Sequence, residues 1–200
     1  MALDGVEVME HLGYRQFSMV GRDRGGRVGR RMALDHPDRV QKLAVMDIVP
    51  AHYLYSHVTI DFVQAYFQWF NYLRRAPGPE NELKMANDAR AARVADPVEK
   101  EYLRHNTDVP TIHAMCEDYR ASASIDLSID EADIKAGKKI QCPLLTLWAA
   151  NGAMGKLYDV LAIWKEEGVN VTGKGLPGNH SLQESAPKET LAELQTFLRA

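Results

Sequence analysis

The sequence has little cysteine and no apolar run long enough to cross a membrane. Its two cysteines, Cys116 and Cys142, are too few for a disulfide framework or a cysteine-rich zinc site. This excludes the small disulfide-stapled secreted proteins. No signal peptide opens the chain, so we expect a cytoplasmic protein whose cysteines are buried, unreactive side chains.

An excess of charge is also missing. The 24 Lys and Arg residues nearly balance 27 Asp and Glu residues, for a net charge of −3. This gives no electrostatic reason to expect nucleic acid or a membrane surface as a partner. With 200 residues, 46% of them hydrophobic and 26% charged, the composition is typical of one globular domain.

What the sequence does contain is an alternation of apolar strands and amphipathic helices. The pattern predicts helices at 2–12, 25–36, 156–167 and 187–199, and strands at 17–20, 42–48, 144–149 and 169–175. Such alternation indicates βαβ units and therefore an α/β fold with a mainly parallel sheet. Residues 51–132 are rich in aromatic residues and helix formers, and we expect no strand there.

The first strand runs into Gly21-Arg22-Asp23-Arg24-Gly25, which has the form glycine, any residue, nucleophile, any residue, glycine. We expect small residues on both sides because the backbone turns too tightly for a neighbouring Cβ. Such a turn presents Asp23 above the sheet at a helix N-terminus, where a carboxylate can attack carbon and form an ester. The alternative is that Asp23 only caps the helix. Further along this helix, Arg30 and Arg31 are expected on a solvated face.

Residues 17–50, with the DRGGRV segment, resemble the haloacetate dehalogenases, a branch of the α/β-hydrolase superfamily that includes fluoroacetate-cleaving enzymes. The resemblance resumes at residues 115–155, with CEDYRA, and at the GNH segment ending in His180. It implies the C-terminal part of an α/β-hydrolase fold. The core would comprise 1–50, with the elbow, and 133–200, with a catalytic His; residues 51–132 would be an inserted helical lid.

By this resemblance, Asp23 is the nucleophile, His180 the base and Asp47 the acid that orients it. Many α/β-hydrolases carry the acid after the penultimate strand, but the sequence there, LWAANGAMG, has no carboxylate. Asp159 is predicted a full turn into the following helix, where it is a poor candidate. Asp47 ends the strand after the elbow helix, a position that this branch uses. The alternative for Asp47 is a turn-forming residue before Pro50.

The resemblance also assigns a substrate-binding set. Arg24 and Arg27 would grip the carboxylate of a 2-haloacid, since a guanidinium binds a planar carboxylate through two parallel hydrogen bonds. A salt bridge to the lid is the alternative for Arg27. Trp69 and Tyr119 would donate hydrogen bonds to the departing halide, and simple aromatic packing is the alternative for the tryptophan.

The chain departs from the family pattern at two positions. Gln68 stands where the family has a histidine before the tryptophan, and Arg22 stands where it has a histidine before the nucleophile. Because Gln68 is a neutral amide, we expect cleavage of fluoride to suffer more than cleavage of chloride.

The sequence therefore predicts a hydrolase that converts short 2-haloacids to 2-hydroxyacids through an aspartyl ester, without cofactor or metal. Two alternatives stay open: an epoxide hydrolase, which the paired arginines disfavour, and a truncated fragment without catalysis. The chain starts at the helix before the nucleophile strand, whereas the family takes one oxyanion donor from strands before that point. We therefore expect little turnover, and at best a homodimer joined near the apolar edge strand at 17–20.

Overall fold

The computed structural model describes residues 1–199, which form two compact units: residues 1–57 with those from 132 onward, and residues 58–131. A four-stranded parallel sheet organises the first unit, in the spatial order β1-β2-β3-β4. Its strands are β1 Phe17–Arg22, β2 Val40–Met46, β3 Leu144–Ala149 and β4 Val171–Leu176. Because all four strands are parallel, their carboxyl ends meet at one edge of the sheet.

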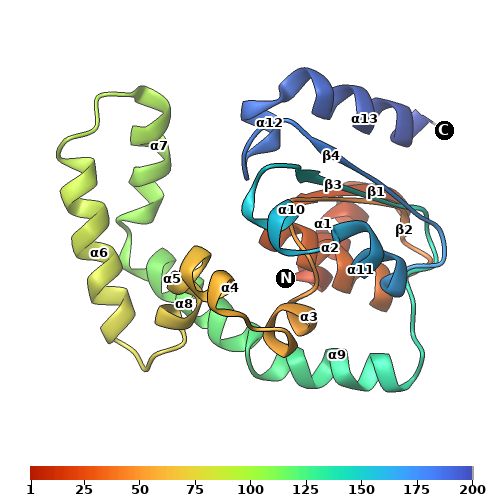
Figure 1. Ribbon diagram of the computed structural model, residues 1–200, viewed down its shortest axis with the longest axis horizontal. Coiled ribbons are helices and arrows are strands. Elements are labelled where there is room, and N and C mark those ends of the chain that lie inside the picture. The colour runs from red at the N-terminus through yellow and green to blue at the C-terminus, as the bar shows by residue number, and fades with distance from the viewer. Residues whose placement is uncertain (200) are drawn as a thin grey trace. The chain divides into compact units, whose positions relative to one another are not determined.

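Helices cover both faces of this sheet (Figure 1). Helix α2, Arg24–Asp35, packs on the face that carries Leu43 and Val45, and α11, Val160–Glu167, lies on the same side. Helix α13, Pro187–Arg199, covers the opposite face through Leu194 and Phe197. Each central strand therefore buries both sets of alternating side chains, which explains its continuous apolar sequence.

The edge strand β1 differs from the strands beside it. Within residues 1–199, β1 pairs with β2 alone. Its Val20 side chain is 37% exposed, whereas Leu43 and Val45 on β2 are fully buried. Helix α1, Ala2–His11, precedes β1 and packs on α2, where Gly5 closely approaches Met32.

The prediction of one continuous helix at 156–167 is wrong, because two helices occupy this region. They are α10, Ala153–Leu157, and α11, with Tyr158 in an extended conformation between them. Asp159 is the N-cap of α11, and its carboxylate accepts a hydrogen bond from the Ala162 N–H at 3.0 Å. The remaining predicted elements of this unit match the structure to within two residues at each end.

The second unit consists of helices joined by turns and short loops, with no strand among residues 58–131. It contains α4 Ile60–Ala65, α5 Phe67–Tyr72, α6 Gly78–Ala91, α7 Pro97–Asn106 and α8 Val109–Ser122. The next helix, α9 Ile125–Lys135, begins in this unit and ends in the first. Side chains of Thr59, Asp96 and Asp108 cap α4, α7 and α8 by accepting backbone N–H groups. The short helix α3, Ala51–Ser56, lies in residues predicted as lid but belongs to the first unit. Within residues 1–199, no helix has both the length and the apolar character of a membrane span.

Candidate active site

The backbone bends sharply between β1 and α2, and Asp23 occupies the bend with a positive φ of 51°. A Cβ at Gly21 would lie 2.3 Å from the Gly25 carbonyl oxygen, so only glycine fits at position 21. We expected that the tight turn would also leave no room for a Cβ at Gly25. This is wrong, because a Cβ there would meet nothing within 4 Å. The tight position is Gly26, whose Cβ would lie 2.8 Å from Ile48 Cγ2.

Asp23 takes the N-cap position of α2, but its side chain makes no capping hydrogen bond. Its Oδ2 instead lies 3.0 Å from Nε2 of His180. The capping alternative therefore does not describe this carboxylate.

Asp47 follows β2 as Asp23 follows β1, and the strand register pairs Arg22 with Met46, directly before the two aspartates. Its Oδ1 accepts the Ala149 N–H at 2.9 Å, which leaves Oδ2 for His180. Asp47 is only 2% exposed and also has a φ of 51°. Parallel strands therefore deliver both carboxylates to one edge of the sheet.

His180 returns to the same edge from the loop after β4. Gly178, with a φ of +125°, turns this loop close to Ser185, whose hydroxyl accepts the Asn179 N–H at 2.9 Å. The His180 ring then lies between two carboxylates: Nδ1 is 2.7 Å from Asp47 Oδ2, and Nε2 is 3.0 Å from Asp23 Oδ2.

These contacts change the ionisation of the site. The hydrogen bonds to Asp23 and then Asp47 raise the pKa of His180 to about 9, against the opposing effect of burial. Burial alone would raise the pKa of Asp23, but its hydrogen bond and attraction to His180 lower that pKa below its usual value. The charges of Arg27 and Arg22 lower it further. At neutral pH, Asp23 is thus an ionised carboxylate beside an imidazolium that donates from both nitrogens.

The arginines of α2 divide into two groups. Arg24 and Arg27 are half-buried in the first turn, directly after Asp23. The prediction of a solvated face for Arg30 and Arg31 is wrong. Arg30 is 5% exposed and donates to Glu167 on α11 at 2.7 Å, and Arg31 pairs with Asp35 and with Asp133. Arg24 and Arg27 thus lie next to Asp23, whereas Arg30 and Arg31 pair with acidic side chains.

The three remaining predicted residues lie in the second unit. Trp69 on α5 is 3% exposed and Tyr119 on α8 is 8% exposed, with their ring centroids 5.7 Å apart. Gln68 is exposed. The structure thus brings Trp69 and Tyr119 together within this unit, as it brings Asp23, Asp47 and His180 together within the other.

Sequence reasoning missed the groups that hold these side chains in place. The Ala149 N–H fixes one oxygen of Asp47, and Ser185 fixes the backbone beside His180. No sequence signal marks the first, since every residue at that position would supply the same N–H. Ser185 lies five residues after His180, a spacing that carries no recognised motif.

Comparison with known proteins agrees with this architecture. A family model described as the alpha/beta hydrolase fold matches residues 2–178. The chain is 37% identical to a fluoroacetate dehalogenase of Burkholderia sp., over 99% of this chain and 68% of that protein. It is 26% identical to a soluble epoxide hydrolase of Corynebacterium sp., over 94% of this chain and 68% of that protein.

Among solved structures, a Salmonella enterica protein provisionally named as an acyltransferase superimposes with a TM-score of 0.93. It shares 40% identity, over 100% of this chain and 69% of that one. These relatives carry the names of three different reactions, so their names alone do not fix a substrate. The family model and the dehalogenase match do fix the lineage: this chain belongs to the α/β-hydrolase family, in its haloacetate dehalogenase branch.

Proposed function

We propose that this protein hydrolyses the carbon–halogen bond of short 2-haloacids. In the first step, an Asp23 oxygen attacks the halogen-bearing carbon and the halide leaves with the bonding electron pair, which produces an ester and inverts that carbon. Arg24 and Arg27 hold the substrate carboxylate and so align the carbon with Asp23. The ionised state of Asp23 at neutral pH supports this role.

In the second step, His180 takes a proton from water, and the resulting hydroxide adds to the Asp23 carbonyl carbon. The tetrahedral oxyanion then collapses, and His180 returns its proton to the departing oxygen, so that the 2-hydroxyacid leaves. The proton of the added hydroxyl passes from the new Asp23 carboxyl group to the freed imidazole, which restores the charges of both side chains. Alkylation removes the negative charge of Asp23, which is the larger of the two influences that raise the pKa of His180. Ester formation therefore lowers that pKa and makes the imidazole a base when water must be activated.

The single observation that carries this proposal is the His180 ring between an elbow carboxylate and a buried carboxylate, at 3.0 and 2.7 Å. For the second unit we propose a lid in which Trp69 and Tyr119 donate hydrogen bonds to the departing halide, beside Gln68. The dehalogenase relative at 37% identity supports this assignment.

Halide release from chloroacetate tests the proposal. Asp23→Asn should abolish turnover, and His180→Gln should accumulate an ester detectable by mass on the peptide that contains residue 23. Asp38→Asn, which alters an exposed carboxylate outside the site, should retain full activity. A His180→Gln enzyme with normal turnover would contradict the assignment.

Isotope labelling separates the ester route from direct attack by water. In one turnover in ¹⁸O-water with excess enzyme, the label should enter the Asp23 carboxylate, and the product hydroxyl should carry an unlabelled oxygen from Asp23. Label found only in the 2-hydroxyacid would exclude a covalent intermediate.

An epoxide hydrolase is the second candidate, favoured by the Corynebacterium relative and by a tyrosine pair in the second unit. The Tyr72 and Tyr119 rings lie 5.0 Å apart, and burial raises the pKa of Tyr72, so this phenol remains a proton donor for an alkoxide. The first-turn arginines favour an anionic substrate instead. Turnover of styrene oxide without turnover of chloroacetate would reverse our choice.

We also propose a cytoplasmic location, where Cys116 and Cys142 stay as free thiols, and a small-molecule haloacid as the partner of the site. The exposed edge of β1 would pair with a second copy of the chain. Light scattering should then show a dimer, which Val20→Lys should dissociate. A monomeric parent chain would contradict this pairing.

A further inference from the structure

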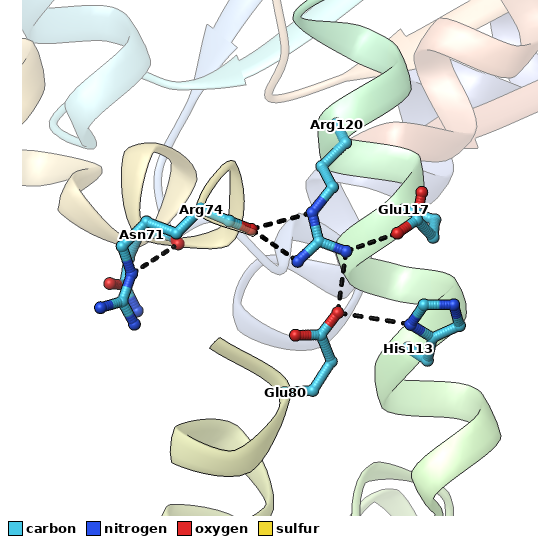
Figure 2. A network of polar contacts seen from close by, with 6 residues as sticks. All are labelled: Asn71, Arg74, Glu80, His113, Glu117 and Arg120. Atoms are coloured by element: carbon cyan, nitrogen blue, oxygen red, sulfur yellow. Dashed lines mark hydrogen bonds and ion pairs between the residues drawn. The ribbon is translucent and has the colours of Figure 1, made fainter. Parts of the chain in front are cut away.

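The side chain of Arg120 is the centre of a polar network in the second unit (Figure 2). Its Nε and Nη2 donate to the backbone carbonyl oxygen of Arg74, at 3.0 and 2.7 Å. Its Nη1 donates to Glu80 Oε1 at 2.8 Å and also pairs with Glu117. One guanidinium therefore joins the chain just after α5 to the start of α6 and to its own helix, α8.

The acidic partner at the centre of this network is Glu80, which is 7% exposed. Its hydrogen bond with Arg120 is the main reason why the pKa of Glu80 is lowered to about 2. His113 Nδ1 lies 3.3 Å from the same Glu80 oxygen. Together with Glu117, these side chains have the chemistry of a metal site, but the guanidinium already occupies the space between the carboxylates. A divalent cation would have to displace Arg120, so we do not propose a metal here.

The network instead adjoins the two aromatic donors. Arg120 directly follows Tyr119 on α8, and Arg74 lies five residues after Trp69. The Tyr119 ring contacts Trp69 at 5.7 Å and Tyr72 at 5.0 Å between centroids. The two bonds from Arg120 to the Arg74 carbonyl therefore fix the end of the segment that carries Trp69 relative to the helix that carries Tyr119.

We propose that Arg120 is a positioning residue that holds Trp69 and Tyr119 as a pair of hydrogen-bond donors converging on one halide. This inference rests on the proposed function. Two donors stabilise a leaving anion only when both point to the same place, and displacement of one by about 1 Å can cost on the order of 10²-fold in rate. Glu80 has a supporting part, because it holds the guanidinium that makes the bridge.

The dependence of rate on the leaving group gives the test. Bromide departs more readily than chloride without help, and smaller anions gain more from hydrogen bonds, so misplaced donors slow chloride departure more. In the His180→Gln background, ester formation followed by mass measures this step alone. Adding Arg120→Gln should slow reaction with chloroacetate about tenfold or more and raise the bromoacetate-to-chloroacetate rate ratio severalfold. Arg120→Lys, which keeps a cation near Glu80, should restore part of both effects.

Arg104→Gln is the matched control, because Arg104 lies in the same unit and pairs with exposed Glu101. It should change neither the rates nor their ratio. In a Trp69→Phe background, Arg120→Gln should add little, since one of the donors that it positions is already absent. Rates that fall equally for both substrates, with an unchanged ratio, would show that Arg120 has only a structural role.

A binding measurement keeps the inference separate from the proposed activity. Iodide should quench tryptophan fluorescence saturably in the parent chain, not in Trp69→Phe, and only at higher concentration in Arg120→Gln. If the parent chain releases no halide but shows this pattern, the proposed reaction is wrong and the positioning role stands. If Arg120→Gln, folded by circular dichroism, binds iodide as tightly as the parent chain, the inference is overturned.

Discussion

The two units each contain a cluster of basic and acidic side chains, but the clusters have different centres. In the first unit an imidazole, His180, lies between the carboxylates of Asp23 and Asp47. In the second a guanidinium, Arg120, lies between Glu80 and Glu117, with His113 at the side (Figure 2). An imidazole can lose its proton in the range where proteins work, whereas a guanidinium keeps its charge.

This difference separates a cluster suited to chemistry from one suited to holding helices together. The charge of His180 depends on its neighbours, so a covalent change at Asp23 can alter it during a reaction. The charge of Arg120 is permanent, and its fork geometry fixes a carbonyl and two carboxylates at once. Four substitutions or conditions test how far this contrast holds.

The largest expected effect comes from breaking the first cluster at Asp47. Asp47→Asn has almost the same shape, but its amide cannot accept from both Ala149 N–H and His180, because one end is itself a donor. We expect haloacid turnover to fall on the order of 10⁴-fold, the loss typical when the orienting acid of a triad becomes an amide. Steady-state halide release measures the fall. Asp38→Asn is again the control, and a loss below tenfold would remove Asp47 from the base-orienting role.

The next effect follows from placing an imidazole at position 68, in the proposed lid. Fluoride needs several strong donors, and one donor to a developing anion typically contributes roughly 2.7–4 kcal/mol. We therefore expect the parent chain to prefer chloroacetate over fluoroacetate widely, and Gln68→His to raise the fluoroacetate rate at least about tenfold. Gln64→His, on an exposed position of α4, is the control. Equal rates on the two substrates in the parent chain would refute the argument.

Breaking the second cluster should lower the stability of the fold. Glu80→Gln removes the buried charge that Arg120 contacts, and we expect the free energy of unfolding to fall by about 2 kcal/mol, as for other hydrogen bonds to charged groups. Glu117 is 51% exposed, so Glu117→Gln should change it by less than about 0.5 kcal/mol. Urea denaturation of both variants measures the difference. Equal losses would show that burial of the carboxylate does not set the strength of this cluster.

A fourth test is the dependence of stability on pH, at alkaline pH for the first cluster and at acid pH for the second. The pKa of His180 is raised from 6.5 to about 9, so its stabilising contribution is complete below pH 6.5 and is lost as pH rises through 9. The pKa of Glu80 is lowered from 4.5 to about 2, so its contribution is present above pH 4.5 and is lost as pH falls toward 2.

Urea midpoints between pH 6 and 10 should therefore fall in the parent chain and fall less in His180→Gln. Between pH 5 and 2, Glu80→Gln should flatten part of the acid loss. A parent chain whose stability rises from pH 7 to 9 would contradict the assigned charge of His180.

Much of the first cluster could be predicted because the end of a buried strand can be recognised in a sequence as the end of an apolar run. Asp23 and Asp47 each follow an apolar run, and parallel strands must bring such ends together. The strand 144–149 and the helix 187–199 were also predictable, since a proline marks the start of each and the apolar pattern of each is continuous. The break at Tyr158 was not, because Asp159 could equally have continued a helix or capped one.

The second cluster could not be predicted. Arg120 donates to the backbone carbonyl of Arg74, 46 residues earlier. Every residue type carries such a carbonyl, so the sequence does not show which one will accept. The same holds for the Ala149 N–H beside Asp47. Sequence patterns identified the side chains that we propose do chemistry, whereas the groups that orient them were found only in the folded structure.

The bend at Asp23 has a consequence for engineering this protein. Its steric demands fall on Gly21 and Gly26, where an added methyl group would collide with backbone or with Ile48. The residue at the bend itself must accept the φ of 51° and ψ of −125° that Asp23 adopts. The bend itself does not depend on the carboxylate of Asp23, whose side chain makes no capping hydrogen bond. A variant that places another side chain at position 23 should therefore leave Gly21 and Gly26 unchanged.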